Sequence, residues 1–525
     1  MMNHERLFDS CAKSERKWRF HSLSSLSRYL FPLTGAAALA WFLWRIITKP
    51  SRINYPCMQI AAPIASSFIF YVTSLILSVL GLRKAYIAMK NHRYAALLAF
   101  ALVVACALVL SGGGMNTELF AIDSSAGNGR FVAIDKPNTP IGKATGIFPG
   151  RVAWAYDPTA SSWDGNSEYW WSDRFTNQQS VSGMLTAVVN NVAGKADVTA
   201  SWDALFKDLN RRKGKGSIGY VTGEKIAIKV NLNSGGGSHG NKTDTSPQLV
   251  YALLDQLVHR VGVPQECITI YDAQRANISA ISDHCSPEFP NAKYNKWGSW
   301  ILDKLTFSSS EIQGSEVRRL PQAVVEADYL INVALLKRHS KLVDKWTDGA
   351  GQTGVTVCGK NHFGTCGKPD ALHVAIRDWN RGMGFYNPIV DLISNKYLGG
   401  NTVLYIVDGL YGADYHFAFP QRWKMPPFND RFPCSVFASQ DILAIDSVCL
   451  DFLNNEWGLV GNADNYLHEA AQAEHPPSGT EYVSEGKRIS SLGVHEHWNN
   501  AVDKQYSRNL KTGDGIELVQ IGPRT

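Results

Sequence analysis

The sequence lacks the cysteine spacing of an iron–sulfur protein. It has nine cysteines among 525 residues, but no two of them stand as CxxC and no run matches a ferredoxin motif. An iron–sulfur cluster of its own is therefore not expected. The part after residue 112 has an even number of cysteines, so disulfides could form in an oxidising compartment. A bridge between Cys358 and Cys366 and ordinary buried thiols are the alternatives for the set Cys267, Cys285, Cys358, Cys366, Cys434 and Cys449.

Basic runs interleaved with aromatic residues, which would grip a nucleic-acid strand, are also missing. The net charge is +6, but much of this excess lies beside apolar segments near the N-terminus. We therefore expect no nucleic-acid partner. Hydrophobic residues make up 45 % of the chain and charged residues 19 %. These values are typical of a folded protein and exclude a largely disordered one.

The first 112 residues contain three long apolar segments, at residues 29–47, 59–82 and 94–110. Each is near the roughly 20 residues that cross a bilayer, and none has a charge in its core. Lys and Arg favour the N-terminal tail and the second loop, which the positive-inside rule assigns to the cytoplasm. We therefore expect three transmembrane helices in a bacterial inner membrane, with the lipid bilayer as a partner and the large domain on the periplasmic side.

A signal peptide is the alternative for part of this region, because residues 89–93 are basic and precede an apolar run. Its cleavage would also export the large domain. We expect residues 1–112 to be an N-terminal membrane anchor and residues 113–145, which show no periodicity, to be a linker. Residues 146–525 are then an exported α/β domain.

The clearest local pattern is a strand–helix–strand unit. Residues 225–232, KIAIKVNL, have the apolar character of a strand, and residues 233–244 form a loop rich in Gly and Ser. A helix is predicted over residues 248–261, with leucines on one stripe and Pro247 at its first position. Residues 267–271, CITIY, are the next strand. This unit predicts parallel pairing with a right-handed crossover.

Further strands are expected at residues 329–336, 403–407 and 435–438. The predicted fold class is therefore α/β, a mostly parallel sheet with helices on both faces, preceded by the three transmembrane helices.

All of these strands end in polar residues. In a parallel sheet the carboxyl ends lie along one edge, where α/β proteins bind their ligands. Two clusters of basic and polar residues, at 337–339 and 359–362, lie on either side of one Gly-containing loop. Helix caps and solvated loops are the alternative for any single residue. We expect ten residues of this edge to form one site: Asn231, Asn233, Asp272, Arg275, Lys337, His339, Lys360, Asn361, Asp408 and Asp441.

Lysine and histidine give this edge its expected chemistry. Lys337 and Lys360, together with Arg338, would hold a carboxylate or phosphate of an anionic small molecule. His339 could act as a general acid or base, because its unperturbed pKa is about 6.5. Asp272, Asp408 or Asp441 could orient it or hold a metal. We predict that His339, Lys337 and Asp272 are catalytic and that the other residues of the edge bind the ligand: Asn231, Asn233, Arg275, Lys360, Asn361, Asp408 and Asp441.

Two histidines near the C-terminus are the candidate metal ligands. His495 and His497 stand at i and i+2, so on an extended chain both point to the same side and could share a divalent metal with a carboxylate. A polar loop with two ordinary histidines is the alternative. Far upstream, the aromatic stretch of residues 163–171 either packs between elements or forms a recognition surface.

Four stretches of the large domain, taken in order, resemble one bacterial family: KIAIKVNLN, TSPQLVYALLDQL, EADYLINVALLKRH and GVTVCGKNHFG. This is domain-of-unknown-function family 362, and the closing LGVHEHWNN is similar to a membrane-anchored subgroup of it. The resemblance covers residues 145–525 and implies an α/β domain. Many relatives are exported or carry added ferredoxin-like clusters, whose cysteines this chain lacks. The family has no agreed activity, and its signature positions correspond here to Lys337, His339, Lys360 and Asn361.

These observations favour a membrane-anchored domain outside the cytoplasm that binds an anionic small molecule as an enzyme, with a divalent metal as the candidate cofactor. A non-catalytic binding or assembly domain of the cell envelope is the first alternative. An accessory protein for redox chemistry or cofactor maturation is the second, and it rests on the family resemblance alone.

Overall fold

The structure is a computed structural model. It describes Trp44 and residues 136–166, 168–233, 241–339, 355–376, 384–415, 417–458 and 463–522. The chain divides into two compact units, Met1–Ala126 and Gly127–Thr525.

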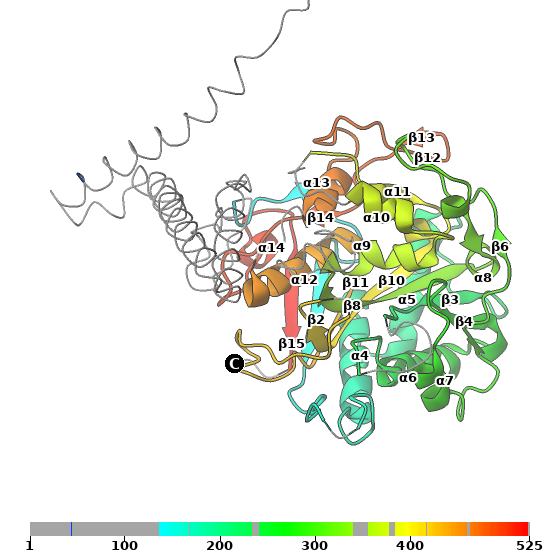
Figure 1. The fold of residues 1–525 in the computed structure, drawn as a ribbon, viewed down its shortest axis with the longest axis vertical. Helices are drawn as coiled ribbons and strands as arrows, with labels where there is room; N and C mark the ends of the chain where they lie inside the picture. Colours follow the sequence, from blue (N-terminus) through cyan, green and yellow to red (C-terminus); the bar gives the residue numbers. More distant parts are fainter. Residues whose placement is uncertain are drawn as a thin grey trace, which may run out of the picture. The chain divides into compact units, whose positions relative to one another are not determined.

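A mixed β-sheet forms the centre of the second unit (Figure 1). In the part of the chain that the structure describes it has nine strands, in the order β15-β2-β11-β10-β8-β3-β4-β5, with β9 paired to β8. The strands are β2 (Arg151–Tyr156), β3 (Ile226–Lys229), β4 (Ile268–Tyr271), β5 (Lys293–Tyr294), β8 (Tyr329–Arg338), β9 (Val355–Thr356), β10 (Thr402–Ala413), β11 (Ser435–Ser439) and β15 (Glu517–Ile521).

Strands β4, β3, β8 and β10 run in one direction. β3 pairs in parallel with both β4 and β8, and β8 pairs in parallel with β10. Both β8 and β10 are buried over their whole length. A parallel strand that is covered on both faces reads as a nearly continuous apolar run, which is how these two strands appear in the sequence.

Strand β11 reverses direction, so the sheet is mixed rather than wholly parallel. Five of the eight strand pairings in the described sheet are parallel, which agrees with the prediction of a mostly parallel sheet. β11 pairs antiparallel with β10 and with β2, and Ser439 lies opposite Tyr405. A parallel return from β10 would need a crossover connection, usually a helix. In their described part, residues 414–434 instead form turns and two isolated bridges, and they return the chain as an antiparallel neighbour.

Helices cover both faces of the sheet (Figure 1). One face carries α4 (Gln178–Ala193), α5 (Val198–Arg212) and α6 (Pro247–Asp255), and the other carries α9 (Cys358–Asn361), α11 (Pro388–Ser394) and α12 (Ile442–Trp457). The remaining short elements are β1 (Ile141–Gly142), η3 (Gln256–Val261), η4 (Gln265–Cys267), α7 (Ser279–Cys285), β6 (Trp300–Ile301), η5 (Glu316–Arg318), β7 (Leu320–Pro321), α8 (Gln322–Val325), η6 (His362–Thr365), α10 (Asp370–Ile376), η7 (Gly399–Asn401), α13 (Asn465–Ala471), β12 (Val483–Ser484), β13 (Lys487–Arg488), β14 (Val494–His495) and α14 (Ser507–Leu510).

The predicted strand–helix–strand unit is confirmed. Ser246 caps α6 by accepting a hydrogen bond from the Leu249 N–H, and Pro247 takes the first helical position. The chain continues as η3 to Val261 and stops at Gly262, whose φ of 84° is left-handed. Glycine adopts that conformation without steric cost, so the helix ends where the sequence indicates.

The predicted transmembrane helices receive no support. In the described ranges no helix is long and apolar enough to cross a membrane. The three apolar segments, at residues 29–47, 59–82 and 94–110, lie outside the described residues except for Trp44. Apolar composition and length are necessary for a spanning helix but do not by themselves establish one. The fold class is therefore corrected to a mixed α/β sheet, and the described residues give no support to three preceding transmembrane helices.

The six cysteines of the large domain are all free. A bridge between Cys358 and Cys366 is thus not formed, and the buried-thiol alternative holds for this pair. Their thiols lie near carbonyl oxygens instead, of Ile406 at 3.9 Å and of His362 at 3.5 Å respectively.

The aromatic stretch packs mainly inside the domain. Trp163 and Trp170 are buried, whereas Tyr169 is 50 % exposed. The indole N–H of Trp170 donates to the Lys242 carbonyl oxygen at 3.0 Å. The stretch therefore holds the segment that leads into α6, and this segment borders the candidate site.

Candidate functional site

Polar side chains gather where β3, β4 and β8 end. The three strands are parallel neighbours, so their carboxyl ends share one edge of the sheet. The short helix α9 and the turn after it lie over this edge, because β9 pairs with the end of β8 and leads directly into α9. Segments far apart in the sequence thus contribute to one small region.

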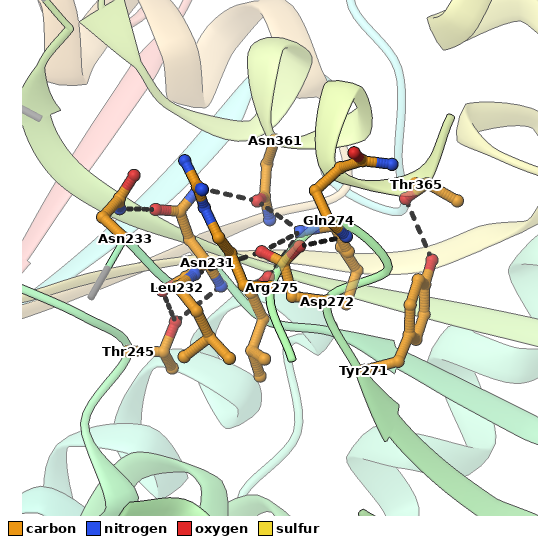
Figure 2. Close-up of polar contacts among 12 residues, drawn as sticks. Asn231, Leu232, Asn233, Thr245, Tyr271, Asp272, Gln274, Arg275, Asn361 and Thr365 are labelled. Carbon is orange, nitrogen blue, oxygen red and sulfur yellow. Dashed lines mark hydrogen bonds and ion pairs between the residues drawn. The ribbon is translucent and has the colours of Figure 1, made fainter. Parts of the chain in front are cut away.

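An asparagine network forms the centre of this region (Figure 2). The Asn361 Oδ1 atom accepts hydrogen bonds from Asn231 Nδ2 and Lys229 Nζ, both at 3.0 Å. Asn361 Nδ2 donates to Asn332 Oδ1 at 2.7 Å. Asn233 Nδ2 donates to Asn231 Oδ1 at 2.7 Å. These amides are buried and hold one another in fixed orientations, which gives the edge a rigid polar surface.

Below the network lies a buried ion pair. Lys229 Nζ stands 3.2 Å from Asp272 Oδ2, and both side chains are almost wholly buried. The same carboxylate accepts hydrogen bonds from the backbone N–H groups of Leu232, at 3.2 Å, and Gln274, at 3.0 Å. Burial lowers the pKa of Lys229, and the charge of Asp272 opposes this effect. Asp272 therefore lies at the predicted edge, but its oxygens are occupied by one cation and two amides.

Gly364 packs so closely against this ion pair that a side chain at position 364 would not fit. A Cβ atom at position 364 would lie 2.6 Å from Lys229 Nζ and 3.1 Å from Asp272 Oδ1. The Gly364 carbonyl oxygen also accepts a hydrogen bond from the Ala273 N–H at 2.9 Å. A side chain at position 364 would thus displace the ammonium group from its partners.

Two further lysines of the edge are buried. Lys337 Nζ donates to the Thr243 carbonyl oxygen at 3.2 Å, and its side chain is 0 % exposed. Burial lowers its pKa to about 7, against the opposing charges of Asp244 and Asp272. Burial, with a smaller effect of Lys337, also lowers the pKa of Lys360 to about 7. Burial therefore favours the neutral amine form of both lysines more than in an exposed lysine.

Lys360 is held by two imidazoles. Its Nζ atom lies 3.4 Å from His339 Nε2 and 3.1 Å from His373 Nε2. The Nδ1 atom of His373 lies 2.9 Å from the Pro369 carbonyl oxygen. Since a carbonyl can only accept, His373 Nδ1 carries the proton, and in the neutral ring Nε2 offers its lone pair to the lysine. The ammonium also lies 4.7 Å from the centre of the Phe363 ring.

His373 was not predicted from the sequence as a site residue. It stands on α10, thirteen residues after Lys360, and no strand end or motif marks it. Lys229 and Asn332 were also missed, because within an apolar strand a single polar residue carries no sign of its partners. The approach of α10 to the sheet edge brings His373 to the site, and α9 supplies Asn361, the shared partner of Lys229 and Asn332.

Asp446 fixes the position of α9. This residue of α12 accepts hydrogen bonds from the backbone N–H groups of Cys358, at 2.9 Å, and Gly359, at 2.8 Å, and from the Tyr466 hydroxyl at 2.9 Å. Burial raises its pKa to about 7, and the hydrogen bonds oppose that shift. The next two residues of α9, Lys360 and Asn361, are therefore placed by a carboxylate on another helix.

Two of the ten predicted residues serve as backbone acceptors. Asp408 accepts from the N–H groups of Ser246, at 2.8 Å, and Leu410, at 3.0 Å, and so ties the start of α6 to β10. Asp441 caps α12 by accepting from Leu443 and Ala444. Because β11 is antiparallel to β10, its last residues lie beside the first half of β10. Asp441 is thus at the opposite edge, and its predicted place in the site is wrong.

The other predicted residues lie at or beside the edge. Arg275 follows β4 and is half-buried, and in Figure 2 its side chain extends toward Asn231. Its charge lowers the pKa values of Lys229 and Lys337, although burial is the larger cause. Asn233 is part of the asparagine network, and His339 contacts Lys360 as described. The structure therefore brings together Asn231, Asn233, Asp272, Arg275, Lys337, His339, Lys360 and Asn361.

The two candidate metal ligands form a separate buried cluster. The ring centres of His495 and His497 are 4.9 Å apart, so both do lie on one side of the chain. His495 Nδ1 contacts the Ser447 hydroxyl at 2.8 Å, and His497 Nδ1 contacts Asp451 Oδ1 at 2.6 Å. Burial lowers the pKa of His497, but Asp451 and then Asp464 outweigh it and raise that pKa to about 10.

Within the described ranges no group of three or more His, Cys, Asp or Glu side chains could hold a metal ion. A metal at His495 and His497 thus gains no support from the geometry and stays a prediction.

A comparison with known families identifies this region. The family model described as a domain of unknown function, DUF362, matches residues 226–451. The chain contains a DUF362 domain. The match begins at the first residue of β3 and ends within α12, so it includes Lys229, Lys337, Lys360 and Asp446 and leaves out His495. No curated protein and no solved structure matches the chain.

Proposed function

We propose that the DUF362 domain of this chain binds an anionic small molecule at the edge formed by β3, β4 and β8. Lys337 and Lys360 would hold its carboxylate or phosphate, and His339 would transfer a proton. Support comes from the geometry of the edge. The ligand class is an oxyanion, because the buried groups that converge there are ammonium and amide donors.

The observation that carries this proposal is the environment of Lys360. Its side chain is 5 % exposed. Among the described residues its ammonium contacts two histidines and no carboxylate. Burying a charged group without a counter-charge is costly, so in the absence of a ligand the amine tends to lose its proton. A bound anion would supply the missing charge and return the proton to the lysine.

Proton transfer follows from the same contacts. His339 Nε2 and His373 Nε2 both face the Lys360 amine, and the ordinary pKa of imidazole lies within reach of neutral pH. A substrate held by the lysines would therefore meet a proton carrier within one hydrogen bond. This arrangement favours an enzyme of acid–base type over a domain that only binds.

The alternative of an envelope assembly domain depended on an exposed aromatic surface. Trp163 and Trp170 are buried, and they support packing rather than recognition. The anion site is therefore the stronger basis for a function.

The test is anion binding by the full chain and by a Lys360→Met variant. Met keeps the apolar stem of the lysine and removes the charge. Lys396→Met is the matched control, because Lys396 is half-exposed and pairs with Glu485 on the surface. In calorimetric titrations with inorganic phosphate and with citrate, we expect Lys360→Met to lose at least about tenfold in affinity, the value of one charge-assisted hydrogen bond. Equal affinities for Lys360→Met and Lys396→Met would refute the proposal.

A further inference from the structure

A second cation at the end of β8, Arg338, points away from Lys337. Lys337 and Arg338 are consecutive residues of one strand, so their side chains extend to opposite faces of the sheet. Lys337 reaches Thr243, which precedes α6. Arg338 reaches the other side, where its Nη1 atom donates to the carbonyl oxygen of Trp457, the last residue of α12, at 2.9 Å.

The Arg338 guanidinium has unused donors deep in the protein. The residue is 3 % exposed, and its Nε and Nη2 atoms have no hydrogen-bond partner in the part of the chain that the structure describes. Arg338 takes part in none of the ion pairs found among the described residues. Burial lowers its pKa to about 10 while Asp414 opposes the shift, so the group keeps its charge at neutral pH. A buried charge in this state lacks the compensation that stable folds provide.

The two nitrogens without a partner, Nε and Nη2, form one edge of the guanidinium. Nε–H and Nη2–H point the same way, and together they fit two oxygens of one carboxylate or phosphate. The third nitrogen is tied to Trp457, which fixes the orientation of that edge before any ligand arrives.

Asp414 adds a hydrogen-bond acceptor to these donors. Its Oδ1 atom is also buried without a hydrogen-bond partner, and its backbone N–H donates to Gln421 Oε1 at 2.9 Å. Its charge acts on Arg338, yet the two side chains form no ion pair. The pocket thus offers two donors and one acceptor, which an oxyanion with an O–H group would satisfy together.

A surface cleft is lined by neighbours of Arg338 and Asp414, although not by these two residues themselves. It has a volume of about 470 Å³, and its walls include Trp457 and Gln421, the residues that hold Arg338 and Asp414. Arg422 and Lys424 line the same cleft together with Asp164 and Glu456. Cations and carboxylates are thus equal in number on its wall, so the selection of an anion falls to the Arg338 guanidinium.

We propose that Arg338 and Asp414 form a second anion subsite, on the face of the sheet that carries α12, which takes hydrogen phosphate. The Arg338 edge binds two phosphate oxygens, and Asp414 Oδ1 accepts the phosphate O–H. Sulfate has no proton at neutral pH, so it meets the Asp414 carboxylate with repulsion. This subsite is independent of Lys360 and of the function proposed for it.

The test measures phosphate bound per full chain by equilibrium dialysis at pH 7 and constant ionic strength. Four variants are compared with the wild type: Arg338→Met, Arg338→Lys, Asp414→Asn and, as the control for the other site, Lys360→Met. We expect Arg338→Met to lose one phosphate that Lys360→Met retains. Arg338→Lys keeps the charge without the paired edge and should bind that phosphate about tenfold more weakly, the loss of one charge-assisted bond.

Selectivity provides the second readout. The wild type should prefer phosphate to sulfate at this subsite by at least about tenfold, and Asp414→Asn should remove most of that preference. Should Arg338→Met fold poorly, Arg338→Lys and Asp414→Asn still decide the question. Unchanged phosphate stoichiometry and affinity in the Arg338 variants, or equal selectivity in wild type and Asp414→Asn, would overturn the proposal. Binding of an acetate probe at the Arg338 edge in preference to phosphate would overturn the choice of ligand.

Discussion

Replacing Gly364 with alanine tests whether the buried ion pair organises the site. The added Cβ would lie 2.6 Å from Lys229 Nζ and 2.9 Å from Lys229 Cε. A lysine tip can usually move aside, but this one is wholly buried and bonded to Asp272 and Asn361. It cannot shift without leaving those partners.

The expected loss of stability follows from two typical free-energy costs. Over-packing a core costs about 1–3 kcal/mol, and breaking a buried ion pair costs about 3–5 kcal/mol. We therefore expect Gly364→Ala to lower the free energy of unfolding by about 3 kcal/mol, where these ranges meet. Urea unfolding, followed by tryptophan fluorescence and by circular dichroism, would measure the loss as a lower midpoint.

Gly183→Ala is the matched control. Gly183 lies within α4, and a Cβ there would have no atom within 4 Å. Alanine is the better helix former, so this variant should gain roughly 0.5–1 kcal/mol. In a Lys229→Ala background the Gly364→Ala penalty should shrink, because the clashing atoms are gone. Equal stability of Gly364→Ala and wild type, or an undiminished penalty in that background, would refute the reasoning.

Further predictions concern pH and the opposite edge of the sheet. Burial lowers the pKa values of Lys337 and Lys360 from 10.5 to about 7. The unfolded chain therefore binds more protons between these values, and stability should rise with pH across the window, by up to about 1.4 kcal/mol per unit for each lysine. Lys360→Met should flatten this slope in urea titrations, and wild-type anion affinity should fall above pH 7. Asp441→Ala removes the acceptor for four N–H groups, of Thr145, Leu443, Ala444 and Val494. It should cost about 2 kcal/mol in thermal unfolding and leave phosphate binding unchanged, since Asp441 is remote from the site.

Local patterns in the sequence were sufficient for the strand–helix–strand unit and for much of the edge. Pro247 and Gly262 mark the two ends of one helical stretch through local backbone preferences. In the sequence β8 appears as an apolar run followed by polar residues. This pattern arises because the strand is buried between the helices and the residues after it lie at the edge of the sheet. For this reason Asn231, Lys337, Lys360 and Asn361 were expected at one edge, and the structure places them there.

Tertiary structure alone decided the direction of β11, the partners of Lys360 and the role of Arg338. The direction of a strand depends on which neighbour it meets, and nothing in residues 435–438 records that β10 and β2 run antiparallel to them. Asp441 was misplaced for this reason. His373 reaches Lys360 only because α10 returns to the sheet edge. In the sequence Arg338 is one of three adjacent basic residues, with Lys337 and His339. Its separate environment arises because neighbouring side chains of a strand point to opposite faces of the sheet, and α12 covers the face to which Arg338 points.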